Sequence, residues 1–327
     1  MPGLGALKFD HLRAAAAPLA EILRRSDGTV TKPETFDLRG FTARAGGPFD
    51  EKIFGATIPC VCRKEKPRDT RIREALGTAL CAACGATPTA NEARRTRLGR
   101  VALTVPVAHP FFREEIAAAA GLARETLDAI LATENWVCVE DGAFGKRGTT
   151  FVQEQDWAAD SRPPMTGGPA VAALLEDTPA IDGFAPRDWM LNAIPILPPG
   201  LRPMKSMTEL SDADQLYRRL INRNDRLRRL LELNAPEIIL RNEIRMAQEG
   251  IDATFDNERQ PGKIAIGGGR APLESLLGAI GGLEGVRAFL RRFDDAISSG
   301  DASPDHPGEH AEDLARVRAM ALTIALA

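Results

Sequence analysis

The segment from residue 211 to residue 257 constrains the fold most, because its apolar residues recur at helical spacing on both sides of one short break. Ser211 and Asp214 fit the pattern of a helix N-cap. Asn234 can take the left-handed conformation that ends a helix, and Pro236 suits the first turn of the next one. Two helices joined by so short a turn must lie antiparallel.

This helical hairpin is predicted to project from the body of the protein. Its first helix would extend roughly 35 Å, and it is too polar for a compact core. Its charge is lopsided, because arginines outnumber acids on the first helix. The predicted apolar stripes are Leu216, Leu220, Leu227, Leu230 and Leu231 on the first helix, and Ile238, Ile239, Met246 and Ile251 on the second.

Three asparagines, Asn222, Asn224 and Asn242, fall among these apolar positions. Asparagine has a poor helix propensity, so they indicate hydrogen bonds that fix the alignment of the helices or contact a partner. The alternative is an ordinary surface hairpin crossed by salt bridges.

The run DWMLNAIPILPPGLRPM at residues 188–204, followed by LYRRLINRNDRLRRLL and APEIILRNEIRMAQE, resembles the N-terminal clamp region of the β′ subunit of bacterial RNA polymerase. In that family the hairpin is the clamp-helix coiled coil, which docks region 2 of the sigma factor. The resemblance implies a sigma factor as the partner. The positions that match the sigma-contacting part of the family are Arg219, Arg223, Arg226, Asn242, Glu243 and Arg245.

Four of the five cysteines form a Cys-x-Cys pair and a Cys-x-x-Cys pair, namely Cys60, Cys62, Cys81 and Cys84. Two close pairs of thiolates can complete a tetrahedral, structural zinc site. Two disulfides or unrelated thiols are the alternatives, but an unexported chain keeps its thiols reduced. The β′ family has a zinc-binding module with similar cysteine pairs near its N-terminus. Cys138 has no such partner and is predicted to be a buried small hydrophobe.

Two further segments resemble parts of the β′ family that lie near nucleic acid. VTKPETFDLRGFTARAGGPFDEKIFG leads into the cysteine cluster and carries Arg39 and Arg44. NERQPGKIAIGGGRAPLESLLGAI resembles the family's rudder and carries Lys263 and Arg270. These four residues are predicted to contact nucleic acid, and solvated loop cations are the alternative reading of the first two.

Composition limits the possible partners and chemistry. The net charge of −3 excludes a uniformly basic coat for nucleic acid, so DNA would have to meet local patches. The absence of a signal peptide and of a long apolar span predicts a cytoplasmic protein with no membrane contact. After about Leu290 the sequence departs from the β′ family and lacks its three metal-binding aspartates, so no catalysis is expected from the chain alone.

The sequence thus predicts an α+β fold, mostly helical, with a four-cysteine zinc ribbon or knuckle and a projecting hairpin. The expected modules are 1–55 (N-terminal clamp segment), 56–100 (zinc module), 101–205 (clamp body), 206–257 (hairpin), 258–290 (rudder-like loop and helix) and 291–327 (C-terminal helix).

Three functions remain open at this point. The first is a non-catalytic, clamp-like protein that binds a sigma factor in transcription initiation. The second is the N-terminal piece of a split β′ subunit, with RNA polymerase core subunits and promoter DNA as partners. The third is a zinc-ribbon DNA-binding protein unconnected to polymerase.

Overall fold

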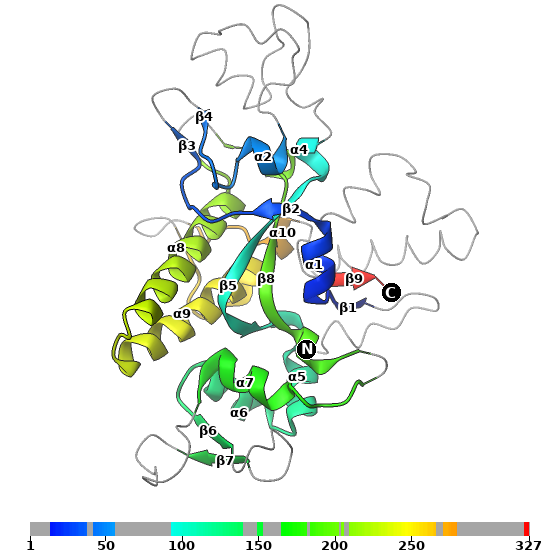
Figure 1. The fold of residues 1–327 in the computed structure, drawn as a ribbon, viewed down its shortest axis with the longest axis vertical. Coiled ribbons are helices and arrows are strands. Elements are labelled where there is room, and N and C mark those ends of the chain that lie inside the picture. Colours follow the sequence, from blue (N-terminus) through cyan, green and yellow to red (C-terminus); the bar gives the residue numbers. More distant parts are fainter. Residues whose placement is uncertain are drawn as a thin grey trace, which may run out of the picture.

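The computed structural model describes residues 14–37, 42–55, 93–139, 149–152, 165–181, 184–202, 204–205, 209–265, 271–279 and 324–326. At its centre lies a twisted sheet in the strand order β2-β5-β8 (Figure 1). Strand β2 (Ser26–Thr29) runs parallel to the start of β5 (Leu98–Ala108), and β8 (Met190–Ile196) runs antiparallel to β5. This sheet is the platform on which the helices of the candidate site rest.

The long strand β5 pairs with β8 in two stretches separated by an irregularity. Ala102 pairs with Ala193, and the next pair is Val107 with Leu191. Strand β5 therefore has more residues between these pairs than β8 has, as in a β-bulge that bends a strand. Residues 103–106 of β5 are left without partners in β8, and they lie beside the candidate site.

Helices at one end of the sheet supply much of the apolar core. Helices α5, α6 and α7 pack on one another and α7 packs on β5, whereas α1 packs on β8 (Figure 1). The glycine Gly168 lets α7 approach β5, because a Cβ atom there would lie 2.0 Å from the Pro106 carbonyl oxygen. The bounds of these helices are Leu19–Arg25 for α1, Arg113–Ala120 for α5, Arg124–Leu131 for α6 and Gly167–Leu175 for α7.

Smaller elements surround this body. Three two-stranded sheets join β1 (Ala14–Ala16) to β9 (Ile324–Leu326), β3 (Phe36–Asp37) to β4 (Thr42–Ala43), and β6 (Trp136–Val139) to β7 (Thr149–Val152). Short helices are α2 (Glu51–Phe54), α4 (Ala93–Thr96) and α10 (Leu276–Ala279). The described part is α+β with more helix than strand, as predicted.

Two local predictions were wrong. The predicted C-terminal helix does not include Ile324–Leu326, which form a strand that pairs antiparallel with Ala14–Ala16. The backbone groups of those three alanines need a partner, and that distant pairing prevails over the helical spacing of the apolar residues. The composition of residues 142–185, rich in glycine, proline and threonine, predicts loops around one short helix, but Thr149–Val152 form β7, which pairs antiparallel with β6.

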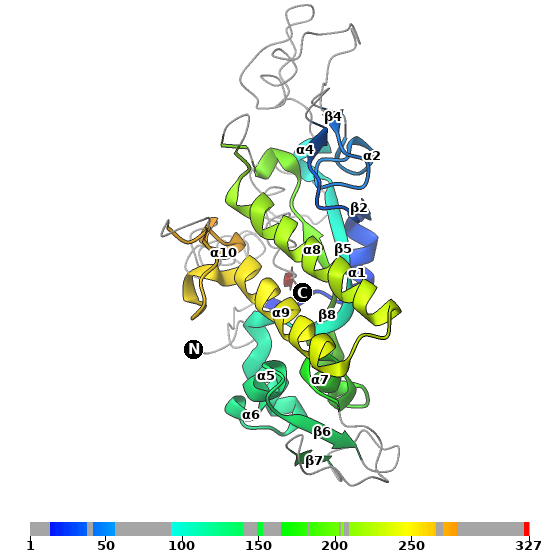
Figure 2. The same cartoon turned by 90° about the vertical axis from the view of Figure 1, so that its left-hand side faces the viewer.

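Two long helices, α8 (Asp212–Glu232) and α9 (Glu237–Asp256), pack side by side and are called the helix pair below (Figure 2). Ser211 accepts a hydrogen bond from the Asp214 N–H at 3.1 Å, and Asn234 has a φ of 48°. Pro236 stands directly before the first helical residue of α9. The predicted cap and turn are therefore confirmed.

The apolar stripe of the helix pair is shorter than predicted. Leu216, Leu220, Leu227 and Ile251 are buried as expected, but Ile238 is 66% exposed and Ile239 is 41% exposed. Near the turn the two helices lie at the periphery in both views (Figures 1 and 2). Helical spacing alone cannot tell the part of a stripe that meets a neighbouring element from the part that runs past it.

Candidate protein-binding site on the helix pair

Asn224 fastens α8 to the bulged part of β5. Its Nδ2 donates to the Ala102 carbonyl at 2.9 Å, and its Oδ1 accepts from the Thr104 N–H at 2.7 Å. By donating one hydrogen bond and accepting another, the amide side chain makes the bonds to β5 that a neighbouring strand would otherwise make. Of the three asparagines predicted to fix helix alignment or to contact a partner, Asn224 therefore fixes the position of α8, whereas Asn222 and Asn242 are exposed.

Gln248 plays the same part for α9 at the far end of β5. Its Oε1 accepts from the Ala108 N–H at 3.0 Å, and its Nε2 donates to the Ala108 carbonyl at 2.9 Å. Pro106 lies between the two anchored stretches and has no N–H to satisfy. Hydrogen bonds thus align both helices on one strand. Because these bonds are directional, they resist sliding of the helices along β5 better than apolar contacts would.

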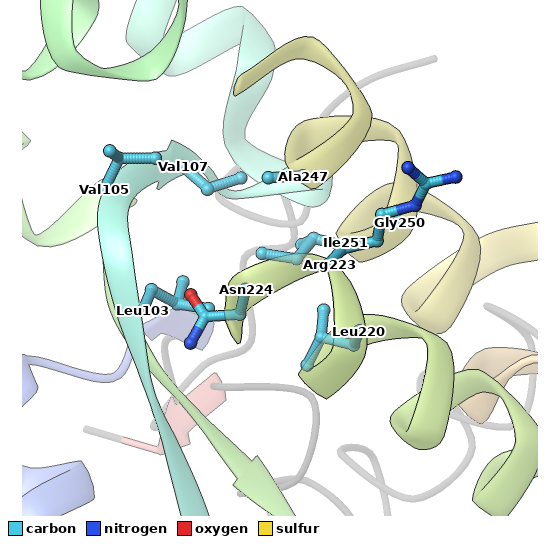
Figure 3. A pocket seen from close by; sticks show the side chains of 9 residues that line it. All are labelled: Leu103, Val105, Val107, Leu220, Arg223, Asn224, Ala247, Gly250 and Ile251. Carbon is cyan, nitrogen blue, oxygen red and sulfur yellow. The ribbon is translucent and has the colours of Figure 1, made fainter. Parts of the chain in front are cut away.

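A small, mostly apolar groove lies where the helix pair meets β5 (Figure 3). Gly250 opens one side of it, because a Cβ atom there would meet nothing within 4 Å. The lining residues are Leu103, Val105, Val107, Leu220, Arg223, Asn224, Ala247, Gly250 and Ile251.

A buried arginine ties the start of α8 to the N-terminal part of the chain. The Arg202 guanidinium pairs with Asp214, donates to the Leu197 carbonyl at 2.7 Å, and donates to the Pro48 carbonyl. It also lies over the Phe49 ring, 4.6 Å from its centroid. Elements far apart in the sequence are therefore joined through one side chain.

The outer face of the helix pair is organised around Glu243 of α9. One carboxylate oxygen, Oε1, lies 2.9 Å from Arg226 Nε, and the other, Oε2, lies 3.4 Å from Arg223 Nη1. The Glu243 side chain is 2% exposed, whereas Arg223 is 32% and Arg226 is 61% exposed. Both arginines belong to α8, so the contact joins the two helices and leaves positive charge outermost.

The other predicted partner contacts lie along the same two helices. Asn242 and Arg245 of α9 are joined, since Arg245 Nη2 donates to Asn242 Oδ1 at 2.8 Å. Arg219 is exposed one helical turn before Arg223. The structure therefore places all six predicted residues on the helix pair, with Glu243 beneath the surface rather than on it.

An exposed apolar patch at the turn end of the helix pair was not predicted from the sequence, which assigned three of its four residues to the apolar stripes of the hairpin. Leu233 is 76% exposed, and three further large apolar side chains accompany it. Such residues beside a polar rim are typical of a protein-binding surface. Their position within a few residues of the turn at Asn234 is the sequence signal that could have distinguished them from buried stripe residues. The patch consists of Leu231, Leu233, Ile238 and Ile239.

The predicted nucleic-acid contacts are only partly within the described residues. Arg44, just after β4, lies 3.8 Å from Asp37 and is more than half exposed. Lys263 is exposed in the loop after α9. Arg39 and Arg270 lie outside the described residues.

The four predicted zinc ligands, Cys60, Cys62, Cys81 and Cys84, also lie outside the described residues. The chain on either side of them is held together, because Arg94 Nη1 donates to the Gly55 carbonyl at 2.8 Å. Burial, together with the positive charge of Arg202, lowers the pKa of Arg94 to about 10. Gly55 and Arg94, which stand on either side of residues 56–92 in the sequence, therefore contact each other. Within the described ranges, no cluster of three or more metal-ligating side chains is found.

Among the residues that the structure covers, no helix has the length and apolar character needed to cross a membrane.

The part of the chain that contains the helix pair matches a known protein family. Residues 179–288 match the family model described as RNA polymerase Rpb1, domain 1. This range includes β8, α8, α9 and α10. The resemblance to a polymerase subunit is therefore confirmed at this level, and residues 179–288 form a region related to the largest subunit of RNA polymerase.

Proposed function

We propose that this protein is a non-catalytic, β′-clamp-like protein that binds region 2 of a sigma factor through the helix pair and acts in transcription initiation. The observation that carries the proposal is the arginine-bearing outer face of the helix pair, with Arg223 and Arg226 held from below by Glu243. This face lies within the polymerase-related range 179–288.

The chemistry of this face suits an acidic, partly apolar protein surface. Arginine forks bind carboxylates in a defined geometry, and the patch around Leu233 can bury apolar side chains of the same partner. Aligned on β5 by Asn224 and Gln248, the helices would meet a partner with little loss of conformational freedom. The sequence resemblance supplies the identity of the partner, a sigma factor.

Binding of purified sigma region 2 by the full chain tests the proposal. We expect Arg223→Ala and Arg226→Ala together to weaken binding by at least about 2 kcal/mol, or roughly thirtyfold. Arg228→Ala is the matched control, because Arg228 is an exposed arginine of the same helix that pairs with Asp225. Absence of binding by the unmodified chain, or equal binding by the double variant, would overturn the proposal.

We also propose that Cys60, Cys62, Cys81 and Cys84 hold a structural zinc ion. Four thiolates in two close pairs form a closed tetrahedral donor set with no position left for a substrate. The hydrogen bond between Arg94 and Gly55 supports an inserted module, since it joins the two parts of the chain that flank residues 56–92 in the sequence. Zinc would supply folding energy to that module.

The family match favours a second candidate function. The matching family model describes a domain of a polymerase largest subunit, so the chain is alternatively one piece of a split β′ subunit. Such a piece would join other polymerase subunits and meet promoter DNA through residues such as Arg44 and Lys263. Co-purification from the native cell separates the two functions, because only the second requires stoichiometric core subunits.

A further inference from the structure

The buried position of Glu243 raises a question about how the helix pair would recognise its partner. Glu243 matches a family position expected to contact a sigma factor, yet its side chain is 2% exposed. Each of its two carboxylate oxygens already faces an arginine of the opposite helix. A partner residue could reach this carboxylate only by displacing Arg223 or Arg226.

The two arginines are arranged differently around this carboxylate. Arg226 makes its contact through Nε at 2.9 Å and remains 61% exposed, so the outer part of its guanidinium is accessible. Arg223 lies deeper, because its Nη1 is shared between Glu243 Oε2 at 3.4 Å and Met246 Sδ at 3.3 Å. Glu243 thus limits the rotamers of two long side chains that would otherwise lose entropy on binding.

We infer that Glu243 is a positioning residue: it holds Arg223 and Arg226 from within the helix pair, and these arginines recognise carboxylates on an acidic surface of the partner. This inference rests on the proposed function, and it specifies the chemistry of the partner surface. Glu243 would then affect affinity without touching the partner.

Binding kinetics with purified sigma region 2 give a first test of the role of Glu243. With Glu243→Gln the arginines lose their charged anchor, so we expect the dissociation rate to rise about fivefold or more. The association rate at low salt should not fall, because removing a negative charge strengthens the attraction of an acidic partner. The control is Glu237→Gln, which removes an exposed carboxylate from the same helix. A lower association rate with an unchanged dissociation rate would overturn the inference.

A double-mutant cycle gives the sharper test. In a background of Arg223→Ala and Arg226→Ala, Glu243→Gln should change affinity less than twofold, because the groups it positions are absent. A direct contact predicts instead the same loss in both backgrounds. Arg226→Lys is a second variant at an exposed site, and it should bind nearly as weakly as Arg226→Ala, because a lysine ammonium that pairs with Glu243 leaves no guanidinium fork for the partner.

A measurement on the protein alone separates failure of this inference from failure of the proposed function. In nuclear magnetic resonance spectra of the full chain, the Arg226 Nε–H should exchange slowly with solvent, and at least fivefold faster in Glu243→Gln. Unchanged exchange would overturn positioning even if sigma region 2 binds. Faster exchange without any binding of sigma region 2 would leave positioning standing and overturn the proposed function instead.

Discussion

Asn224 and Thr104 are joined by two hydrogen bonds that connect α8 to β5. The Thr104 N–H donates to Asn224 Oδ1 at 2.7 Å, and the Thr104 hydroxyl donates to the Asn224 carbonyl at 3.1 Å. The first bond satisfies a backbone donor that the bulge has removed from the β5–β8 ladder. The helix is therefore part of the hydrogen-bonding scheme of the sheet, and not only packed against it.

Asn224→Ala should lower the free energy of unfolding by about 2–3 kcal/mol. The substitution leaves the Thr104 N–H and the Ala102 carbonyl without their side-chain partner in a half-buried setting. Urea unfolding followed by circular dichroism measures the change. Asn222→Ala is the control, because Asn222 is exposed on the same helix and alanine is the better helix former. A loss equal to that of the control would contradict the anchoring role.

Gly250→Ala should raise the free energy of unfolding by about 0.5–1 kcal/mol. Gly250 stands inside α9, where glycine costs more backbone entropy than alanine, and the added Cβ meets nothing within 4 Å. Gly168→Ala should do the opposite, since its Cβ would lie 2.0 Å from the Pro106 carbonyl oxygen. Thermal unfolding of both variants checks the pair. If Gly250→Ala is instead destabilised, the groove beside Gly250 has no room for the added methyl group.

The elements that the sequence predicted best are those whose signals are local. The ends of α8 and the turn at Asn234 follow from capping and left-handed preferences that act within a few residues. The need for a hydrogen bond at Asn224 was also visible in its poor propensity. The partner of Asn224 could not be predicted, because Thr104 lies 120 residues away in the sequence. Its N–H can bond to α8 because the irregularity in β5 leaves Thr104 without a partner in β8.

For the site residues as well, the sequence predicted which residues belong to the site but not how deeply each is buried. A match to a family motif placed Arg223, Arg226 and Glu243 in one site, and the structure brings the three together. The match could not show that Glu243 is buried, because burial depends on which rotamers the arginines of the opposite helix adopt. Three residues of the exposed apolar patch, Leu231, Ile238 and Ile239, were assigned to the apolar stripes of the hairpin, since periodicity does not report where a neighbouring element ends.

Asp214→Asn should destabilise the protein by about 3–5 kcal/mol. It leaves the Arg202 guanidinium buried without its carboxylate, and an uncompensated buried charge is costly. Chemical unfolding gives the value. Replacing the pair together, as Arg202→Met with Asp214→Leu, should recover part of the loss, because the buried charge is then gone as well. A double variant less stable than Asp214→Asn would show that the contacts of Arg202 with Leu197 and Pro48 outweigh its pairing.

The purified chain should contain one zinc ion per molecule, and Cys60→Ser should release it. Three thiolates and a water bind zinc more weakly than four thiolates, so the variant should lose metal to a chelator that leaves the unmodified chain loaded. Elemental analysis after dialysis measures the metal content. Cys138→Ser is the matched control, because Cys138 belongs to β6 and to neither cysteine pair. Metal loss from the control, or full retention by Cys60→Ser, would assign the zinc to other ligands. Zinc loss should also leave α8 and α9 folded, since Asn224 and Gln248 hold these helices through hydrogen bonds to β5, outside residues 56–92.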